Sequence, residues 1–365
     1  MIQIIAREFC IDGDLVEVTP LGHGHINDTF VATYCRAGKS VRYVHQRINR
    51  HVFKDPAAVM DNIARATQHI RAKLLAAGAP DVARRVLTLV PTRNGGIFHR
   101  TADGDFWRTY LFIDNARIQD AVETPQQAHQ AALAFGEFQK QLADLPGSRL
   151  AETIPHFHDT PRRFAKLEQA VAQDVINRAA TAKTEIEFAL RHKNMTGILL
   201  DLHARGAIPE RITHNDTKFN NVMLDDATGE ALCVLDLDTV MPGLALYDFG
   251  DMVRTATCAC AEDDTDLSKA RIQVPMFEAL TRGYLASVGD VLNATEKQYL
   301  AFAGKLMTFE VGVRFLTDYL EGDHYFKVHR PAHNLDRCRN QFALVASIAA
   351  QEGAMDRVVA RVSAE

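Results

Sequence analysis

The sequence predicts an α+β fold with two lobes, a small antiparallel β lobe followed by a larger, mainly helical lobe. The first observation is that residues 1–113 alternate apolar and polar side chains over short segments separated by turn residues, which is typical of half-buried strands. The second is that residues 114–365 place apolar side chains three and four positions apart, which is typical of amphipathic helices. This change of period predicts that the lobes meet after residue 113.

The β lobe is predicted to contain roughly five antiparallel strands and one helix. The strand patterns cover residues 15–21, 26–36, 41–48 and 86–113, the last of which offers three short strands between glycine-containing turns. The helix covers residues 55–78. Asp55 is placed to cap this helix, Pro56 suits its first turn, and Gly78 follows its end.

The helical lobe begins with a pattern over residues 124–145, for which Thr124 is the expected N-cap. Residues 185–206 show the same spacing of apolar side chains, and long helical patterns run from residue 275 onward. The sequence contains no internal repeat, so we expect one large helical lobe and not an array of similar units.

An irregular segment with two prolines, residues 152–164, links the first two helical patterns. It contains His156 and His158, which are two positions apart and have no third ligand near them in the sequence. Zinc sites need more ligands than this. We therefore expect these histidines to brace the lobes and not to bind a metal.

Bulk properties place the chain among ordinary globular proteins. Of its 365 residues, 47% are hydrophobic and 24% are charged, and the formal net charge is −5. No basic surplus indicates nucleic acid, and no stretch reaches the about 20 apolar residues of a membrane span. The first residues lack the pattern of a signal peptide. The six cysteines lack the spacing of a zinc or redox site. We expect a cytoplasmic protein with reduced thiols.

The stretch 214–238 concentrates polar side chains between apolar runs. The polar residues that matter are His214, Asp216, Lys218, Asn221 and Asp236. Such groups are costly to bury unless they are paired, hydrogen-bonded or bound to a cation. The apolar segment before Asp236 is predicted to be a β-hairpin with its turn near residues 227–229, which would bring Asn221 and Asp236 opposite one another. An amide oxygen beside a carboxylate suits Mg²⁺.

A loop that begins His-x-Asp and ends in Asn, followed by a hairpin and an Asp, is typical of the kinase fold. The predicted fold is therefore protein-kinase-like. Asp216 is expected to accept the proton of the attacking hydroxyl, and Lys218 to neutralise the transferring phosphoryl group. Asn221 and Asp236 are expected to hold Mg²⁺ on the phosphates of ATP, whereas His214 braces the loop.

Two further carboxylates offer alternatives for the metal. Asp248 belongs to an Asp-Phe-Gly tripeptide, which supplies the metal ligand in protein kinases, but it does not directly follow the hairpin. We therefore expect Asp248 to be a structural acceptor that holds the catalytic loop. Asp238 is a second candidate ligand only if the strand continues past Asp236, since alternate residues of a strand point the same way.

The nucleotide phosphates are expected to lie against the glycines of the first hairpin, Gly22 and Gly24, because residues without a Cβ allow the backbone to approach closely. Two glycines are also compatible with an ordinary hairpin turn. The strand that carries a phosphate-binding Lys in kinases has none here. Gln46 and Arg47 are its candidate replacements, and an Arg can neutralise phosphate whereas a Gln can only donate hydrogen bonds.

The segment that joins the two lobes presents backbone groups to adenine in this fold. Phe112 and Ile113 are the candidates, although the same residues would suit a buried edge strand. We thus expect residues 1–113 to form the nucleotide-binding lobe and residues 114–365 to carry catalysis and substrate binding.

The loop His214 to Asn221, together with "VLDLDTVMPGLALYDFGDMVR", resembles the aminoglycoside phosphotransferase and choline kinase superfamily. Within it, the chain is most similar to the N-acetylhexosamine 1-kinases, on the stretches "GHGHIND", "ETIPHFHDTPRRF", "THNDTKFNN" and "VGVRFLTDYLEGDHYF". The resemblance runs over nearly the whole chain. It implies phosphorylation of a hexosamine at its anomeric hydroxyl, which composition and spacing do not reveal.

The resemblance also implies substrate-binding residues. These are His25, Arg314, Asp318 and Tyr319, in addition to Asp216. Arg314 and Asp318 are four positions apart in an apolar helical pattern, so a simple salt bridge along one helix face is the alternative. His25 belongs to the glycine loop, and a lone histidine in a loop is often only solvated.

We therefore expect an enzyme, an ATP- and Mg²⁺-dependent kinase of an N-acetylhexosamine (GlcNAc or GalNAc) that acts in carbohydrate metabolism as a monomer. One alternative is a kinase of another small hydroxyl compound, of the choline, aminoglycoside or homoserine type. Such cationic substrates favour carboxylates and aromatic rings around them, and Arg314 disfavours this. Another alternative is a non-catalytic nucleotide-binding module, to which the missing strand Lys points.

Overall fold

The structure is a computed structural model that describes residues 2–22 and 26–365, and it divides into two compact units. Unit 1 comprises Met1–Arg117, Asp144–Pro155 and Met223–Met241, and unit 2 comprises Ile118–Ala143, His156–Val222 and Pro242–Glu365. Unit 1 is built on an antiparallel sheet and unit 2 mainly on helices, so the predicted α+β class is confirmed. The chain first passes from unit 1 to unit 2 after Arg117.

The main sheet of unit 1 is antiparallel, with the strand order β1-β2-β3-β5-β4. Its strands are β1 (Asp14–Pro20), β2 (Asp28–Arg36), β3 (Lys39–Ile48), β4 (His99–Arg100) and β5 (Phe106–Leu111). The expectation of three strands in residues 86–113 is wrong, since only β4 and β5 form there. The first of the three predicted strands forms only an isolated bridge between Leu89 and Tyr110. Pro91 follows this bridge and has no backbone N–H to donate to a neighbouring strand.

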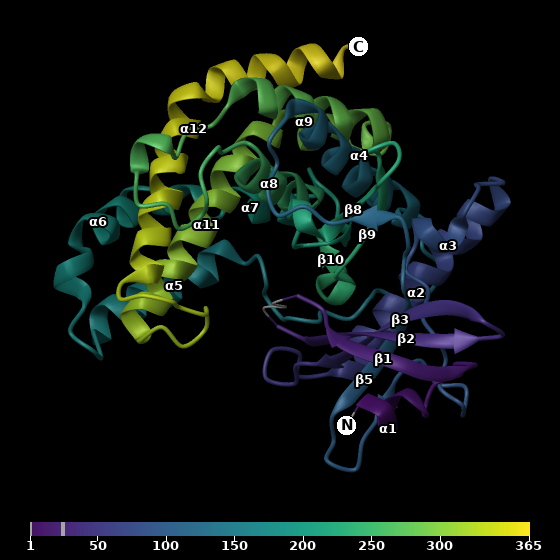
Figure 1. Cartoon of the computed structure of the whole chain (residues 1–365). Helices are drawn as coiled ribbons and strands as arrows, with labels where there is room; N and C mark the ends of the chain where they lie inside the picture. Colours follow the sequence, from purple (N-terminus) through teal and green to yellow (C-terminus); the bar gives the residue numbers. More distant parts are fainter. Residues whose placement is uncertain (1, 23–25) are drawn as a thin grey trace. The chain divides into compact units, whose positions relative to one another are not determined.

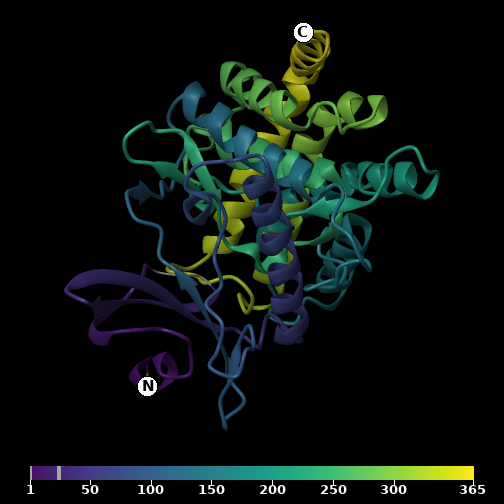
Figure 2. The same ribbon diagram turned by 90° about the vertical axis from the view of Figure 1, so that its right-hand side faces the viewer.

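Apolar side chains from the strands and the N-terminal segment form one core of unit 1. The short helix α1 (Ile2–Ala6), which the sequence did not predict, packs Ile5 against a cluster that includes Phe9 and Trp107. Figure 2 shows these strands in purple and blue with the N-terminus beside them. The same unit contains the four-residue helix α3 (Val82–Arg85).

The long helix of unit 1, α2 (Pro56–Ala76), matches its prediction closely. The carboxylate of Asp55 accepts a hydrogen bond from the backbone N–H of Ala58 at 3.1 Å, which is the expected N-cap. Beyond the end of the helix Gly78 has φ +66°, a conformation that suits glycine.

The predicted hairpin after the catalytic loop is present. Its strands are β8 (Val222–Asp225) and β9 (Ala231–Val234), and β6 (Ala116–Arg117) pairs with the outer edge of β8. Asp225 organises the turn, since its carboxylate accepts the backbone N–H groups of Ala227 and Thr228. Gly229 has φ +71° at the position where the chain returns.

Unit 2 is built from long helices and short connecting turns. The helices are α4 (Pro125–Leu142), α5 (Thr160–Gln173), α6 (Lys183–Arg191), α7 (Ile198–Ala204), α8 (Ala245–Ala256), α9 (Val274–Val288), α10 (Ala294–Gln298), α11 (Leu300–Glu321) and α12 (His333–Ser363). The single helical pattern expected over residues 185–206 is divided between α6 and α7. The break falls before Gly197, where a turn of 3-10 helix intervenes. Thr124 caps α4 as predicted, with a reciprocal bond from Gln127.

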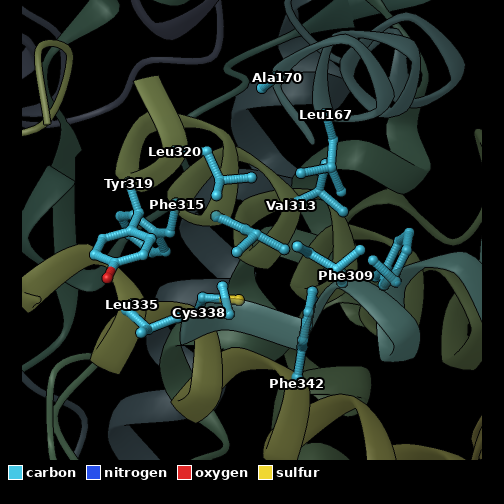
Figure 3. Packing of buried hydrophobic residues seen from close by; sticks show 14 of the residues in the cluster. Leu167, Ala170, Phe309, Val313, Phe315, Tyr319, Leu320, Leu335, Cys338 and Phe342 are labelled. Carbon is cyan, nitrogen blue, oxygen red and sulfur yellow. The ribbon is translucent and has the colours of Figure 1, made fainter. Parts of the chain in front are cut away.

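The helix α11 lies at the centre of unit 2. Of its residues, Phe309, Val313 and Leu316 are fully buried in a cluster that also contains residues of α5, α6 and α12. Figure 3 shows Phe309 and Val313 in this cluster together with Phe342. In Figure 1 the yellow helix α12 runs beside α11, and it also contacts α9. Unit 2 thus surrounds one largely apolar helix.

Two short strands form a small sheet, in which the strand before the catalytic segment pairs with the strand before α8. They are β7 (Arg211–Thr213) and β10 (Met241–Gly243), of which Pro242 and Gly243 belong to unit 2. A Cβ at Gly243 would overlap the Thr213 hydroxyl, so only glycine allows this approach. None of the helices in the described part of the chain combines the length and apolar character that crossing a membrane requires. All six cysteines are free thiols.

We expect Gly250→Ala, in α8, to lower the free energy of unfolding by about 1–3 kcal/mol, because the new methyl group would overlap the backbone of Ala303 and the side chain of Met307 in α11. Gly353→Ala is the matched control, since that glycine lies exposed in α12 and a methyl group there meets only the end of Arg357. The control should gain up to about 1 kcal/mol from helix propensity. Urea unfolding measures both, and equal effects at the two sites would contradict the packing argument.

Candidate active site

The catalytic segment, residues 214–221, connects β7 to β8 and belongs to unit 2. Lys218 places its ammonium 2.9 Å from the carboxylate of Asp216. The side-chain amide of Asn221 donates to the backbone carbonyl of Asp216 at 2.8 Å and to its carboxylate at 3.2 Å. The structure therefore brings together three of the predicted site residues, Asp216, Lys218 and Asn221.

Asp216 is held in its charged form. Burial by itself raises the pKa of a carboxyl group, but the ammonium of Lys218 outweighs this, and the pKa of Asp216 lies below its ordinary value. The same pair raises the pKa of Lys218. The side chains of Asp216 and Lys218 are 26% and 44% exposed, so both remain accessible to a bound molecule.

The backbone of the loop is held by Asp248 at the start of α8. Its two carboxylate oxygens accept the N–H of His214 at 2.9 Å and of Asn215 at 2.7 Å, and the amide of Gln139 adds a third donor. Asn215 has φ +65°, an unfavourable conformation for a residue with a Cβ, so the loop needs this support. The prediction that Asp248 is a structural acceptor is confirmed.

His214 braces the loop, also as predicted. Its ring is fully buried and packs edge-on against Phe135 and Phe138 of α4. Its Nδ1 accepts the backbone N–H of Asp216 at 3.3 Å. The ring therefore links the packing of α4 to the backbone of Asp216.

A second carboxylate of α8 supports the loop, and sequence reasoning missed it. Asp251 accepts the backbone N–H of Thr217 at 2.9 Å, and Arg254 donates to its other oxygen at 2.8 and 3.0 Å. Arg254 also pairs with Glu262. The sequence did contain a signal for this pair, since Asp251 and Arg254 are three positions apart in a helical pattern. Side chains at that spacing meet on one face of a helix.

The segment that follows the hairpin, in unit 1, contains the predicted metal ligand Asp236. This residue is exposed and has φ +53° and ψ +58°, which is the left-handed region. Asp238, two positions later, is buried and forms an ion pair with Arg108 of β5, while Asn27 donates to it at 2.6 Å. Asp238 is thus used within the protein, and Asp236 is the carboxylate that faces outward.

Arg108 is the buried cation of unit 1, with a side chain that is 1% exposed. Burial by itself would lower the pKa of Arg108, but the carboxylate of Asp238 reverses this and the pKa lies above its ordinary value. Arg108 also donates to Gln46, its cross-strand neighbour on β3, at 3.0 Å. No sequence motif marks Arg108, since its importance depends on a partner 130 residues away.

The candidate nucleotide residues on β3 have partners within unit 1. Gln46 bonds Thr29 and Arg108, whereas Arg47 pairs on the surface with Asp28 and Asp105. Their side chains point to opposite faces of the sheet, as adjacent strand residues must.

In the segment that follows β5, the N–H of Phe112 donates to the carbonyl of Arg42 and is therefore used by the sheet, while Ile113 is buried. Gly22 has φ +64°. Gly24 and His25 lie outside the described residues.

The candidate substrate residues on α11 differ in their surroundings. The carboxylate of Asp318 accepts the backbone N–H groups of three successive residues, 324 to 326, and the amide of Asn334. Tyr319 lies in the core next to Leu320 and Leu335, and its hydroxyl bonds Thr181 at 2.9 Å. Both side chains are thus used to hold unit 2 together.

Arg314 is half-buried and has a different environment. Its guanidinium carbon lies 5.2 to 5.7 Å from the ring centres of Phe157, Tyr325 and Phe326. Arg163 approaches the ring of Phe157 as well, at 6.0 Å, and the nearby charge of Arg314 contributes, after burial, to a lowered pKa of Arg163. Among residues 2–22 and 26–365 no carboxylate is within ion-pair distance of Arg314, so the alternative of a helix-face pair with Asp318 is not realised.

The side chains of Asn221, in unit 2, and of Asp236, in unit 1, are each of a chemical type that binds magnesium. The amide nitrogen of Asn221 is bound to Asp216, so its oxygen points elsewhere, and that oxygen accepts no hydrogen bond from the described residues. Asn221 precedes the hairpin and Asp236 follows it, and both offer oxygen, which Mg²⁺ prefers. The described residues contain no group of three or more His, Cys, Asp or Glu suited to a metal, so any ion would depend on other ligands such as phosphate oxygens.

A loop in which an aspartate is paired with a lysine and bonded by an asparagine, ahead of a hairpin that ends in a second aspartate, defines a kinase-type phosphotransferase. The sequence profile of the phosphotransferase enzyme family, APH, matches residues 17–282, which is more than half of the chain. The chain belongs to this family.

Solved structures agree with this fold. An aminoglycoside phosphotransferase from Alicyclobacillus acidocaldarius subsp. acidocaldarius DSM 446 is 12% identical, with 98% of this chain and 96% of that chain covered and a TM-score of 0.63. A choline kinase from Cryptosporidium parvum Iowa II is 14% identical, with 97% and 96% covered and a TM-score of 0.57. Spectinomycin phosphotransferase, in complex with ADP and spectinomycin, is 13% identical, with 93% and 94% covered and a TM-score of 0.54.

We expect Arg108→Met to destabilise the protein by about 3–5 kcal/mol, because it leaves the carboxylate of Asp238 buried without its cation. Arg42→Met is the matched control on the neighbouring strand, since its pair with Asp114 is exposed and should contribute at most about 1 kcal/mol. The double variant Arg108→Met with Asp238→Asn should cost less than the sum of the two single changes. Urea unfolding measures the stability of these variants and of Asp238→Asn alone. An Arg108→Met variant as stable as the Arg42→Met control would contradict the argument.

Proposed function

We propose that this phosphotransferase moves the γ-phosphoryl group of ATP to a hydroxyl group of a small, uncharged molecule. The observation that carries the proposal is the set formed by Asp216, Lys218 and Asn221 in one supported loop. An aspartate that stays charged can accept the proton of the attacking hydroxyl, and a lysine beside it can offset the charge of the transferring group.

Asn221 and Asp236 would hold Mg²⁺ in this proposal, and the ion would neutralise charge on the nucleotide phosphates. In unit 1 the strand lysine of kinases is absent, and the charge of the buried Arg108 is already paired with Asp238. We propose Gln46 for the phosphate side, because Arg47 points to the other face and is paired there. Ile113 is left as the candidate for contact with adenine, since the N–H of Phe112 is already bonded.

For the acceptor we propose the anomeric hydroxyl of an N-acetylhexosamine. The sequence stretches that resemble hexosamine 1-kinases support this. So does Arg314, whose guanidinium lies among three aromatic rings and close to Arg163. Two cations in one place repel an ammonium substrate, whereas an arginine can donate several hydrogen bonds to sugar oxygens. We propose that Asp318 and Tyr319 act only by holding α11 and the loop after it.

A cationic acceptor is the second candidate, and the fold similarity to a choline kinase and to two aminoglycoside-type phosphotransferases favours it. None of these three relatives is named for a hexosamine. The aromatic rings of Phe157, Tyr325 and Phe326 would suit an ammonium group if Arg314 could leave them. A non-catalytic module is the weakest alternative, because the three groups of the catalytic loop are all present.

We expect Asp216→Asn to lower kcat by about 10²–10⁴-fold, since an amide cannot accept the proton. Affinity for ATP, measured by calorimetry in the presence of Mg²⁺, should change little. Asp290→Asn, at an exposed ion pair with Lys140, is the control and should keep full activity. An Asp216 variant that retains most of its ADP release would rule out the assigned role.

A panel of N-acetylhexosamines, amino alcohols and aminoglycosides, tested for ADP release with Mg²⁺ and ATP, separates the two acceptor classes. We expect turnover with a hexosamine and a higher KM for it in Arg314→Met, because hydrogen bonds to the sugar are lost. If the acceptor is cationic instead, the same variant should lower KM, since a repelling charge has been removed.

A further inference from the structure

A buried histidine joins the catalytic loop to α11 within unit 2, and the chemistry proposed above gives it no role. His158 lies in the irregular link, residues 152–164, and is 8% exposed. Its Nδ1 lies 2.8 Å from a carboxylate oxygen of Glu310, and its Nε2 lies 3.2 Å from the backbone carbonyl of Asn215. Glu310 is fully buried in the middle of α11.

The two contacts together specify where the protons are. A backbone carbonyl can only accept, so Nε2 must carry a proton, and a second proton must lie between Nδ1 and Glu310. This proton belongs to the histidine if Glu310 is ionised. Thr160 donates to the other oxygen of Glu310 at 2.5 Å, which favours the charged carboxylate.

The charges around the pair agree with this assignment. Burial by itself raises the pKa of Glu310, but His158, Arg314 and the Thr160 hydroxyl outweigh it, and the pKa of Glu310 lies below its ordinary value. The other charged or titratable groups near the pair are Tyr247 of α8, whose ring centre is 5.0 Å from that of His158, Arg163 of α5, and Asp159, whose carboxylate lies near His156 and caps α5. None of these groups places a carboxylate against the imidazole.

The carbonyl that His158 contacts belongs to the strained residue just before the candidate base. Asn215 has φ +65°, and its N–H is already held by Asp248. With its carbonyl held by His158, the peptide groups on both sides of Asn215 are fixed. The second of these peptide groups contains the nitrogen of Asp216, so its orientation sets the direction of the Asp216 side chain.

We propose that His158 is a positioning residue of the active site: as an imidazolium held by Glu310, it fixes the carbonyl of Asn215 and thereby aims Asp216 at the acceptor hydroxyl. The inference rests on the proposed function in so far as Asp216 is the base. A hydrogen bond from a charged donor is stronger than one from a neutral donor, so loss of the charge weakens the hold on the loop.

The charge state can be tested without any substrate. In ¹⁵N-labelled protein, long-range ¹H–¹⁵N correlation spectra distinguish an imidazolium from either neutral tautomer, and His158→Gln identifies the resonance by its absence. We expect wild-type His158 to be an imidazolium at pH 7.5, because both of its ring nitrogens face acceptors. A neutral tautomer at that pH would overturn the proposal, even if the enzyme proves to act on a different acceptor.

The positioning role is tested by the pH profile of Glu310→Gln, a nearly isosteric change. The amide of a glutamine can donate to Nδ1 while its oxygen accepts from Thr160, so the imidazole becomes neutral and its Nε2–H is an uncharged donor to the Asn215 carbonyl. We expect kcat to fall by up to about a hundredfold at pH 8, with unchanged KM for ATP, because a weaker hold on the loop lets the base move from its productive direction. When the pH is lowered until the imidazole of the variant is protonated, the ratio of wild-type to variant kcat should shrink, since protonation restores the charged donor.

Glu185→Gln is the matched control, because Glu185 is also a buried glutamate of unit 2 that pairs with a cation, Arg339, at 2.8 Å. The ratio of wild-type kcat to the kcat of Glu185→Gln should stay constant with pH. A Glu310 variant with a pH-independent ratio, or with no deficit at pH 8, would show that the pair is only structural and overturn the proposal. Such a result, with Asp216→Asn still inactive, would leave the proposed function standing.

Discussion

The candidate active site depends on the carboxylate of Asp248, which holds two successive backbone N–H groups of the catalytic loop. The loop has to place Asp216 beside Lys218 while Asn215 adopts a left-handed conformation. Such a conformation costs on the order of 1–3 kcal/mol and persists only where the surroundings impose it. The buried start of α8, which carries Asp248, imposes it here.

Charge compensation is the second constraint on the molecule. Two buried carboxylates have their own cations: Asp251 pairs with Arg254 in unit 2, and Asp238 pairs with Arg108 in unit 1. Removing one partner of such a pair is costly because the other remains charged in a poorly polarisable interior. Each pair therefore fixes the backbone of its own unit, around Thr217 in unit 2 and around Asp238 in unit 1.

The sequence predicted the elements whose causes are local. Asp55 caps α2 and Thr124 caps α4, because an N-cap depends only on the next few residues. The roles of His214 and Asp248 followed from a motif whose members lie within one loop and the helix after it. Where the outcome depended on distant partners, prediction failed: residues 86–90 do not form a regular strand, and Arg108 was overlooked because Asp238 is far along the chain.

The sequence by itself determined the class of the chain, the position of its catalytic loop and the residues of that loop that carry charge, because these follow from residue types at short, regular spacing. Only the tertiary structure decided which of the remaining polar residues are used inside the protein. Asp318 and Tyr319 have partners that hold α11 in place, whereas Arg314 of the same helix has none among the described carboxylates. The reason is physical: the free energy of a buried polar group depends on what surrounds it, and its surroundings exist only once the chain has folded.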